Sequence, residues 1–242
     1  MPECTREQAT YAAACRPESA ATYDFYFAIH KGLRLGLSRM LVRLGSVDPA
    51  DPKAVAEVLT DLRVQLVISR GHLEKEEAVI HPALAELAPE AVEELEGDHD
   101  HHREAFDQLE AAIAIVQAAE DRTGPLRDLY LGFSRFVAAD FAHMAHEEQE
   151  TLPILQALFT DAELMAMDHK VRQAMAPEQL VAGGRLILPA LRPAERSHIV
   201  GAMKAAVPPQ AFAGLMAAVA PALEPEQLAQ LKAEFGLELR AA

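Results

Sequence analysis

The chain has 242 residues, half of them hydrophobic, and this is enough to bury a sizeable core without disulfide cross-links. Its formal net charge of −15 repels phosphates, so neither nucleic acid nor an anionic membrane surface is an expected partner. The apolar residues are mainly Ala and Leu, which favour helix over strand, and we therefore expect an all-α protein.

The N-terminal segment, residues 1–19, contains acids and prolines where a signal peptide needs an uninterrupted apolar core. Nor does the chain contain a run of about 18 uncharged apolar residues that could span a bilayer. We therefore expect a cytoplasmic protein. The two cysteines, Cys4 and Cys15, form no CxxC pattern and are expected to be surface thiols.

Four long stretches with helical periodicity follow, separated by Pro, Gly, Asp and Ser residues that favour turns and helix caps. They cover about residues 20–44, 52–82, 89–119 and 125–153. Because short connections make neighbouring long helices antiparallel, these stretches predict an up-down-up-down four-helix bundle over residues 20–160.

Residues 161–242 differ in character, because short helices alternate there with prolines. Pro177, Pro189 and Pro193 recur 32 residues later as Pro209, Pro221 and Pro225. This predicts a small C-terminal helical module with a 32-residue internal repeat. Such helix pairs serve packing or interaction, so the module is where a protein partner is expected.

The bundle region contains a second internal repeat. The segment "HLEKEEAVIHPAL" begins at His72 and the segment "HMAHEEQETLPIL" begins at His143. Both read His, three residues, two Glu, and a Pro five residues later. A His and a Glu four positions apart lie one turn apart on the same helix face and can bind a common ion. Each segment therefore predicts one imidazole and one carboxylate ligand.

The preceding helix in each half offers one further histidine, His30 before the first segment and His99 before the second. Burying such polar groups without partners costs on the order of a few kcal/mol each, so this cluster implies a bound ion. Six ligands exceed what one reactive cation takes, and we expect two cations bridged by both glutamates. The predicted metal ligands are His30, His72, Glu76, His99, His143 and Glu147. Nitrogen and oxygen donors without thiolate suit iron or manganese and fit zinc less well, and iron is the metal we expect.

With these paired motifs the sequence resembles the hemerythrin-like family, also called HHE cation-binding domains, over about residues 20–158. The resemblance implies a four-helix bundle that holds a di-iron centre with a bridging oxo or hydroxo group, and it implies the same six ligands. Family patterns that include an aspartate ligand have no clear counterpart here. Reversible oxygen carriage is therefore not the expected role.

The third helix offers alternatives, because "GDHDHHRE" contains His99, His101 and His102. His99 and His102 share a helix face, and His99 is preferred because its spacing mirrors the first half. His81 and His146 are expected to face solvent, and Tyr26 to fill the core or line the site. Glu77 and Glu148 are expected beside the ligands or at the surface.

A ferritin-like di-iron site is the competing template, and Glu96 with His99 fits its Glu-x-x-His spacing. The fourth helix, however, has Asp140 before His143, and the first offers His30 where that site needs a Glu. We therefore expect a non-haem di-iron protein that binds or senses dioxygen, nitric oxide or peroxide. The alternatives are a di-iron oxidoreductase that turns over peroxide, nitric oxide or an organic substrate, and an iron storage or delivery protein.

Overall fold

The computed structural model describes residues 23, 24 and 26–237 of the chain. Its regular elements within this range are all helices, which confirms the all-α fold class. The predicted N-terminal segment 1–19, with Cys4 and Cys15, lies outside the described residues. None of the helices that the structure describes is long and apolar enough to cross a membrane.

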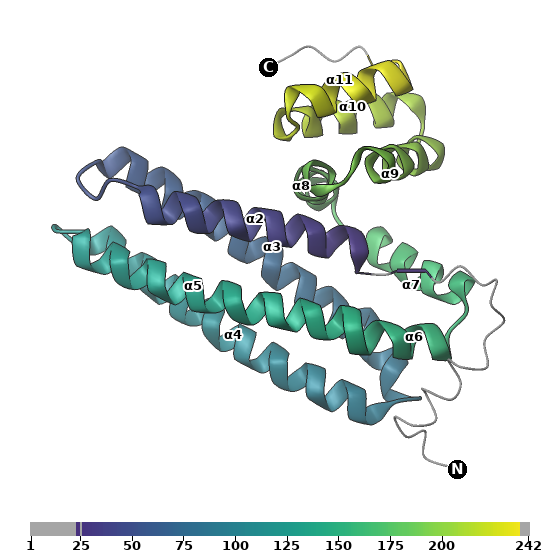
Figure 1. The fold of residues 1–242 in the computed structure, drawn as a ribbon, viewed down its shortest axis with the longest axis horizontal. Helices are drawn as coiled ribbons and strands as arrows, with labels where there is room; N and C mark the ends of the chain where they lie inside the picture. Colours follow the sequence, from purple (N-terminus) through teal and green to yellow (C-terminus); the bar gives the residue numbers. More distant parts are fainter. Residues whose placement is uncertain (1–22, 25, 238–242) are drawn as a thin grey trace. The chain divides into compact units, whose positions relative to one another are not determined.

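Four long helices run antiparallel to their neighbours in sequence (Figure 1). They match the four stretches predicted from periodicity, and their bounds are α2 Phe27–Ser46, α3 Pro52–Ala85, α4 Pro89–Ala118 and α5 Thr123–His146. Two shorter helices continue the chain, α6 Leu152–Leu158 and α7 Asp161–Gln173. A π-helical turn, η1 Glu147–Thr151, joins α5 to α6.

The start of α3 illustrates how the sequence sets these bounds. The Asp51 side chain accepts hydrogen bonds from the backbone N–H groups of Lys53 and Ala54, at 2.9 and 3.0 Å. Pro52 follows at the first helical position, where its missing N–H costs nothing. At the other end, α3 continues through Pro82 to Ala85, three residues beyond the end that this proline predicts.

The described residues divide into two compact units, one comprising residues 23, 24, 26 and 36–173 and the other residues 27–35 and 174–237. Helix α2 is continuous across this division. This division follows boundaries other than those of the domains predicted from the sequence, 20–160 and 161–242. The predicted domains stay a prediction.

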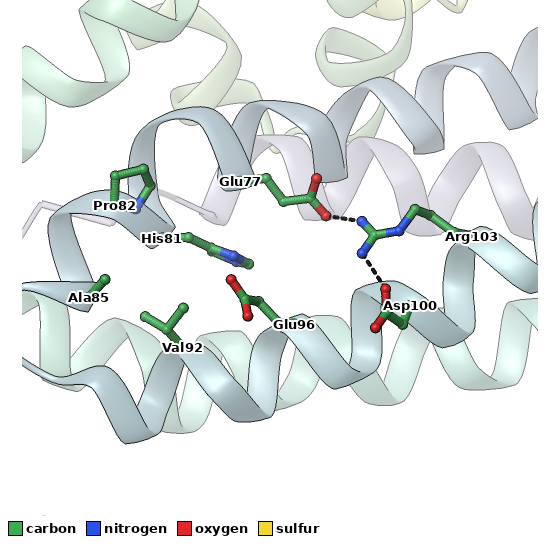
Figure 2. A pocket seen from close by; sticks show the side chains of 8 residues that line it. All are labelled: Glu77, His81, Pro82, Ala85, Val92, Glu96, Asp100 and Arg103. Carbon is green, nitrogen blue, oxygen red and sulfur yellow. Dashed lines mark hydrogen bonds and ion pairs between the residues drawn. The ribbon is translucent and has the colours of Figure 1, made fainter.

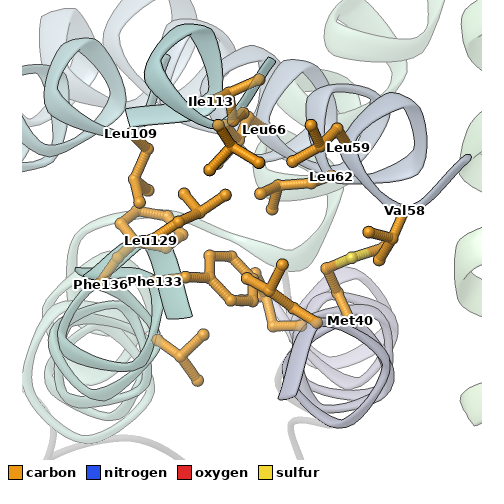
Figure 3. Close-up of a cluster of buried hydrophobic side chains, with 14 of the residues drawn as sticks. Met40, Val58, Leu59, Leu62, Leu66, Leu109, Ile113, Leu129, Phe133 and Phe136 are labelled. Carbon is orange, nitrogen blue, oxygen red and sulfur yellow. The ribbon is translucent and has the colours of Figure 1, made fainter. Parts of the chain in front are cut away.

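The first unit is held together by an apolar core to which α2, α3, α4 and α5 all contribute side chains (Figure 3). Leu37 of α2, Leu62 of α3, Ile113 of α4 and Phe133 of α5 are all fully buried there. Burying one such side chain contributes about 1.5–3 kcal/mol, so this layer fixes the register of the helices. The polar residues discussed below lie further along the same helices.

The second unit contains the same arrangement of elements twice. Helix α8 Pro177–Ile187, a 3₁₀ turn at Leu188–Ala190 and α9 Pro193–Ala206 correspond to helix α10 Pro209–Val219, a 3₁₀ turn at Ala220–Ala222 and α11 Pro225–Phe235. Each of the four helices begins with a proline at its first position. Within the first copy, the buried Arg196 donates hydrogen bonds to the carbonyl oxygens of Leu188 and Leu191.

Candidate metal centre

The first predicted ligand pair lies on α3, where the helix spacing brings the two side chains together. Nε2 of His72 lies 3.1 Å from Oε1 of Glu76, one turn later. Glu76 is 3% exposed, so its carboxylate is withdrawn from water. Burial raises the pKa of Glu76 well above its usual value, and the negative charges of Asp140 and Glu77 act in the same direction. A carboxylate in these surroundings needs a cation to stay ionised.

The second pair lies at the junction of α5 and the π-helical turn η1. His143 is near the end of α5, and Glu147 is the first residue of η1, with 3.6 Å between Nε2 of His143 and Oε2 of Glu147. The proline six residues further on, Pro153, lacks an N–H and would crowd the carbonyl of an α-helical turn. A wider turn relieves that crowding, and π turns of this kind are frequent at functional sites.

His99 of α4 completes this part of the centre. Its Nδ1 lies 2.9 Å from Oε1 of Glu77, and its Nε2 lies 3.8 Å from Oε2 of Glu76. Burial lowers the pKa of His99 to about 4, although the hydrogen bond to Glu77 opposes this, so the ring is neutral at pH 7. A carboxylate only accepts hydrogen bonds, so the ring proton lies on Nδ1 and the lone pair of Nε2 faces Glu76.

Four of the six predicted residues form one group within the first unit. They are Glu76, His99, His143 and Glu147, all of them buried, and their potential ligand atoms lie within 4.8 Å of one another. His72 adjoins this group through Glu76. His30 lies on α2 among residues 27–35, which belong to the second unit, so its part in the centre stays a prediction. The bridging position of the two glutamates stays a prediction as well.

These residues fit metal ions better than they fit an empty polar core. The buried Nε2 atom of His99 has no hydrogen-bond partner among the described residues. Buried polar atoms are normally paired, so a lone pair that faces buried carboxylates in this way favours a bound cation. Imidazole and carboxylate donors without a thiolate are typical of iron and manganese sites.

Comparison with protein-family models gives a match to the hemerythrin HHE cation binding domain over residues 21–155, more than half of the chain. The chain belongs to the hemerythrin HHE cation-binding family. This confirms the resemblance seen in the sequence. Searches of curated proteins and of solved structures found no match.

His102, which shares a helix face with His99 on α4, is also buried in this HHE bundle. His102 is 4% exposed, and its Nδ1 lies 2.8 Å from the carbonyl oxygen of Asp98. Its Nε2 lies 3.4 Å from Oδ1 of Asp140, a buried carboxylate on α5. His102 lies outside the buried group of the first unit, whereas His99 lies in it, and the assignment of His99 as the ligand stays a prediction. His101 is exposed, as its position on the helix predicts.

One expectation about the surroundings of the site was wrong. His81 was expected to face solvent because it precedes Pro82, but it is only 5% exposed. Since α3 continues past this proline, His81 stays on the face that packs against α4, and its ring centroid lies 4.8 Å from that of His99. The four-residue spacing between Glu77 and His81 was the signal in the sequence that could have placed it there.

Tyr26 belongs to the apolar cluster that closes this end of the HHE bundle, together with Ile80 and Leu84 of α3. It is 1% exposed. Burial raises the pKa of the Tyr26 phenol well above its ordinary value, and the charges of Glu147 and Glu76 raise it further. The hydroxyl group therefore keeps its proton, and both expectations for this residue, core packing and nearness to the site, are compatible with its position.

A cavity of about 420 Å³ lies between α3 and α4, beside the buried site (Figure 2). Carboxylates from both helices line it, including Glu77, Glu96 and Asp100, with Arg103 and His81. Arg103 forms ion pairs with Glu77 and Asp100. This guanidinium therefore fixes the carboxylate that in turn contacts His99.

Proposed function

We propose that this chain is a non-haem di-iron protein that binds or senses dioxygen, nitric oxide or peroxide. The observation that carries the proposal is the buried group of Glu76, His99, His143 and Glu147, with His72 3.1 Å from Glu76. Two cations joined by two shared carboxylates would each keep positions that no protein side chain occupies. When bound, iron supplies a redox-active centre to which such small molecules coordinate.

The protein residues would have distinct tasks at this centre. His30 and His72 would bind one ion, His99 and His143 the other, and the two glutamates would bridge them. Glu77 would hold the His99 ring in orientation through Nδ1. The protonated hydroxyl group of Tyr26 would donate a hydrogen bond to a ligand of the centre.

The alternative of an oxidoreductase acting on an organic substrate would need an apolar pocket that opens onto the metals. Four of the eight residues that line the cavity beside the site are charged, which favours a small inorganic ligand over an apolar one. Manganese remains the second choice of metal because it accepts the same donors. The C-terminal helices α8–α11 are the proposed contact surface for a protein partner.

The decisive experiment measures the metal content and the ultraviolet-visible spectrum of protein purified without oxygen, before and after exposure to air, nitric oxide or peroxide. About two irons per chain and a charge-transfer spectrum that changes with one of these ligands are expected. His72→Ala and His143→Ala should each remove that spectrum. Protein with one zinc, or with no metal, would overturn the proposal.

A further inference from the structure

The cavity between α3 and α4 carries an excess of negative charge. Glu77, Glu96 and Asp100 contribute three carboxylates, whereas Arg103 contributes the one guanidinium among its lining residues. Glu96 and Asp100 are exposed, so the negative lining begins at the protein surface. A concave site lined by one sign of charge raises the local concentration of counter-ions, and here these are cations.

At its inner end the cavity meets a nitrogen atom that is suited to a metal ion. His81 is 5% exposed and lines the cavity, and its Nε2 has no hydrogen-bond partner among the described residues. In Figure 2 the His81 ring points towards the carboxylate of Glu96, which comes from the opposite helix. This adds a buried imidazole to the acidic lining, and imidazole with carboxylate is a donor set for divalent transition metals.

The inner end of the cavity is also adjacent to the proposed di-iron centre. The ring centroids of His81 and His99 lie 4.8 Å apart, and those of His99 and His143 lie 5.0 Å apart. Glu77 connects the same two regions, because it lines the cavity and contacts Nδ1 of His99. His81, at the inner end of the cavity, is therefore in side-chain contact with His99, a proposed ligand of the centre.

We propose that this cavity is the entry site through which divalent iron reaches the buried centre, with Glu96 attracting the ion and His81 binding it in transit. The inference rests on the proposed function, since it requires that the centre binds iron. Glu96 and His81 would then determine how fast iron enters the centre. The final ligand set does not include them, so the amount of iron bound at equilibrium should not depend on them.

The test follows the uptake of Fe²⁺ by the full-length protein after its metal has been removed with a chelator. The protein is mixed with Fe²⁺ without oxygen, and unbound Fe²⁺ is trapped with ferrozine at timed intervals. We expect His81→Leu to slow uptake by about tenfold, because it removes the nitrogen that binds the ion in transit, and Glu96→Gln by about two- to fivefold, because it removes a charge that attracts the ion. Both variants should reach the iron content of the unsubstituted protein.

Glu93→Gln is the matched control, because Glu93 is an exposed glutamate of the same helix that does not line the cavity. Uptake in both test variants at the rate of this control would overturn the entry site and leave the di-iron centre standing. A lower final content at an unchanged rate would also overturn it, because His81 would then be a ligand of the centre. If the unsubstituted protein binds no iron, the proposed function and the entry site both fail.

Circular dichroism establishes whether His81→Leu is folded, since it replaces a buried residue. If that variant does not fold, Glu96→Gln alone decides the question, because its side chain is exposed and its loss leaves the core intact.

Discussion

Oε1 of Glu77 lies 2.9 Å from Nδ1 of His99, and this contact fixes which nitrogen of the ring faces the buried carboxylates. Partners of this kind orient metal-binding histidines, and their loss typically lowers metal affinity by about 10- to 100-fold. We expect Glu77→Ala to lower the affinity for iron within this range. Competition with a chelator of known affinity measures the change.

Glu74→Gln is the control for this prediction, since Glu74 is an exposed acid on the same helix. The more conservative Glu77→Gln should lose less affinity than Glu77→Ala, because its amide oxygen still accepts the hydrogen bond from Nδ1. Equal affinity in Glu77→Ala and in Glu74→Gln would mean that His99 needs no partner at Nδ1.

The proposed bridging of two ions by Glu76 and Glu147 predicts an unequal effect of removing single ligands. His72→Ala removes a proposed ligand from one ion and His99→Ala from the other, so each should retain about one tightly bound ion. Glu147→Gln weakens the binding of both ions at once and should retain less than either. Metal analysis after gel filtration in a weak chelator distinguishes these outcomes.

His102→Ala is the informative companion to that series. His102 is buried beside the centre but is not one of its proposed ligands, so this variant should keep both ions. If His102→Ala loses an ion and His99→Ala does not, the ligand of the third helix has been assigned to the wrong histidine.

The sequence predicted the four long helices because their apolar periodicity and turn residues mark them. The spacing from His72 to Glu76 places the two side chains on one face of α3 in any α-helix. The duplicated motif, at the junction of α5 and η1, brings His143 and Glu147 close together as well. The approach of His99 to Glu76 needed only the antiparallel arrangement of neighbouring helices. These features depend on local geometry and on simple topology.

Other features depend on packing that the sequence does not display. Pro82 and Pro153 occupy equivalent positions in the repeat, yet α3 passes through the first without a π turn, whereas a π turn precedes the second. The burial of His81 follows from that continuation of α3. The 3.4 Å approach of His102 to Asp140 depends on how α4 packs against α5, and no spacing within one helix predicts it.

The apolar core of the first unit should dominate the stability of the bundle. Leu62 of α3 is fully buried, and Leu62→Ala should lower the free energy of unfolding by about 2–5 kcal/mol because it removes apolar contacts and leaves a cavity. Val67 is on the same helix and is 68% exposed, so Val67→Ala should change it by less than about 0.5 kcal/mol. Urea unfolding of metal-free protein compares the two without the contribution of bound ions. Similar losses in both variants would mean that this core layer does not hold the bundle together.

The contacts of Tyr23 predict that the protein loses stability at alkaline pH. Its hydroxyl group donates a hydrogen bond to Asp168 of α7, and its backbone N–H donates to the Asp161 carboxylate at 2.8 Å. Burial, followed by the contact with Asp168, raises the pKa of Tyr23 from 10.0 to about 12. Between these values the folded protein keeps the phenol proton that the unfolded chain has released.

Because the unfolded chain binds fewer protons in this interval, the free energy of unfolding should fall as the pH rises from about 10 to about 12. Tyr23→Phe should flatten this fall in part, and the remainder comes from Tyr26, whose pKa burial also raises. The measurement is the urea midpoint at pH 9, 10 and 11, with Tyr130→Phe as the control for losing a phenol elsewhere in the bundle. An equal pH dependence in Tyr23→Phe and in the unsubstituted protein would show that the contact between Tyr23 and Asp168 does not hold the phenol proton in the folded state.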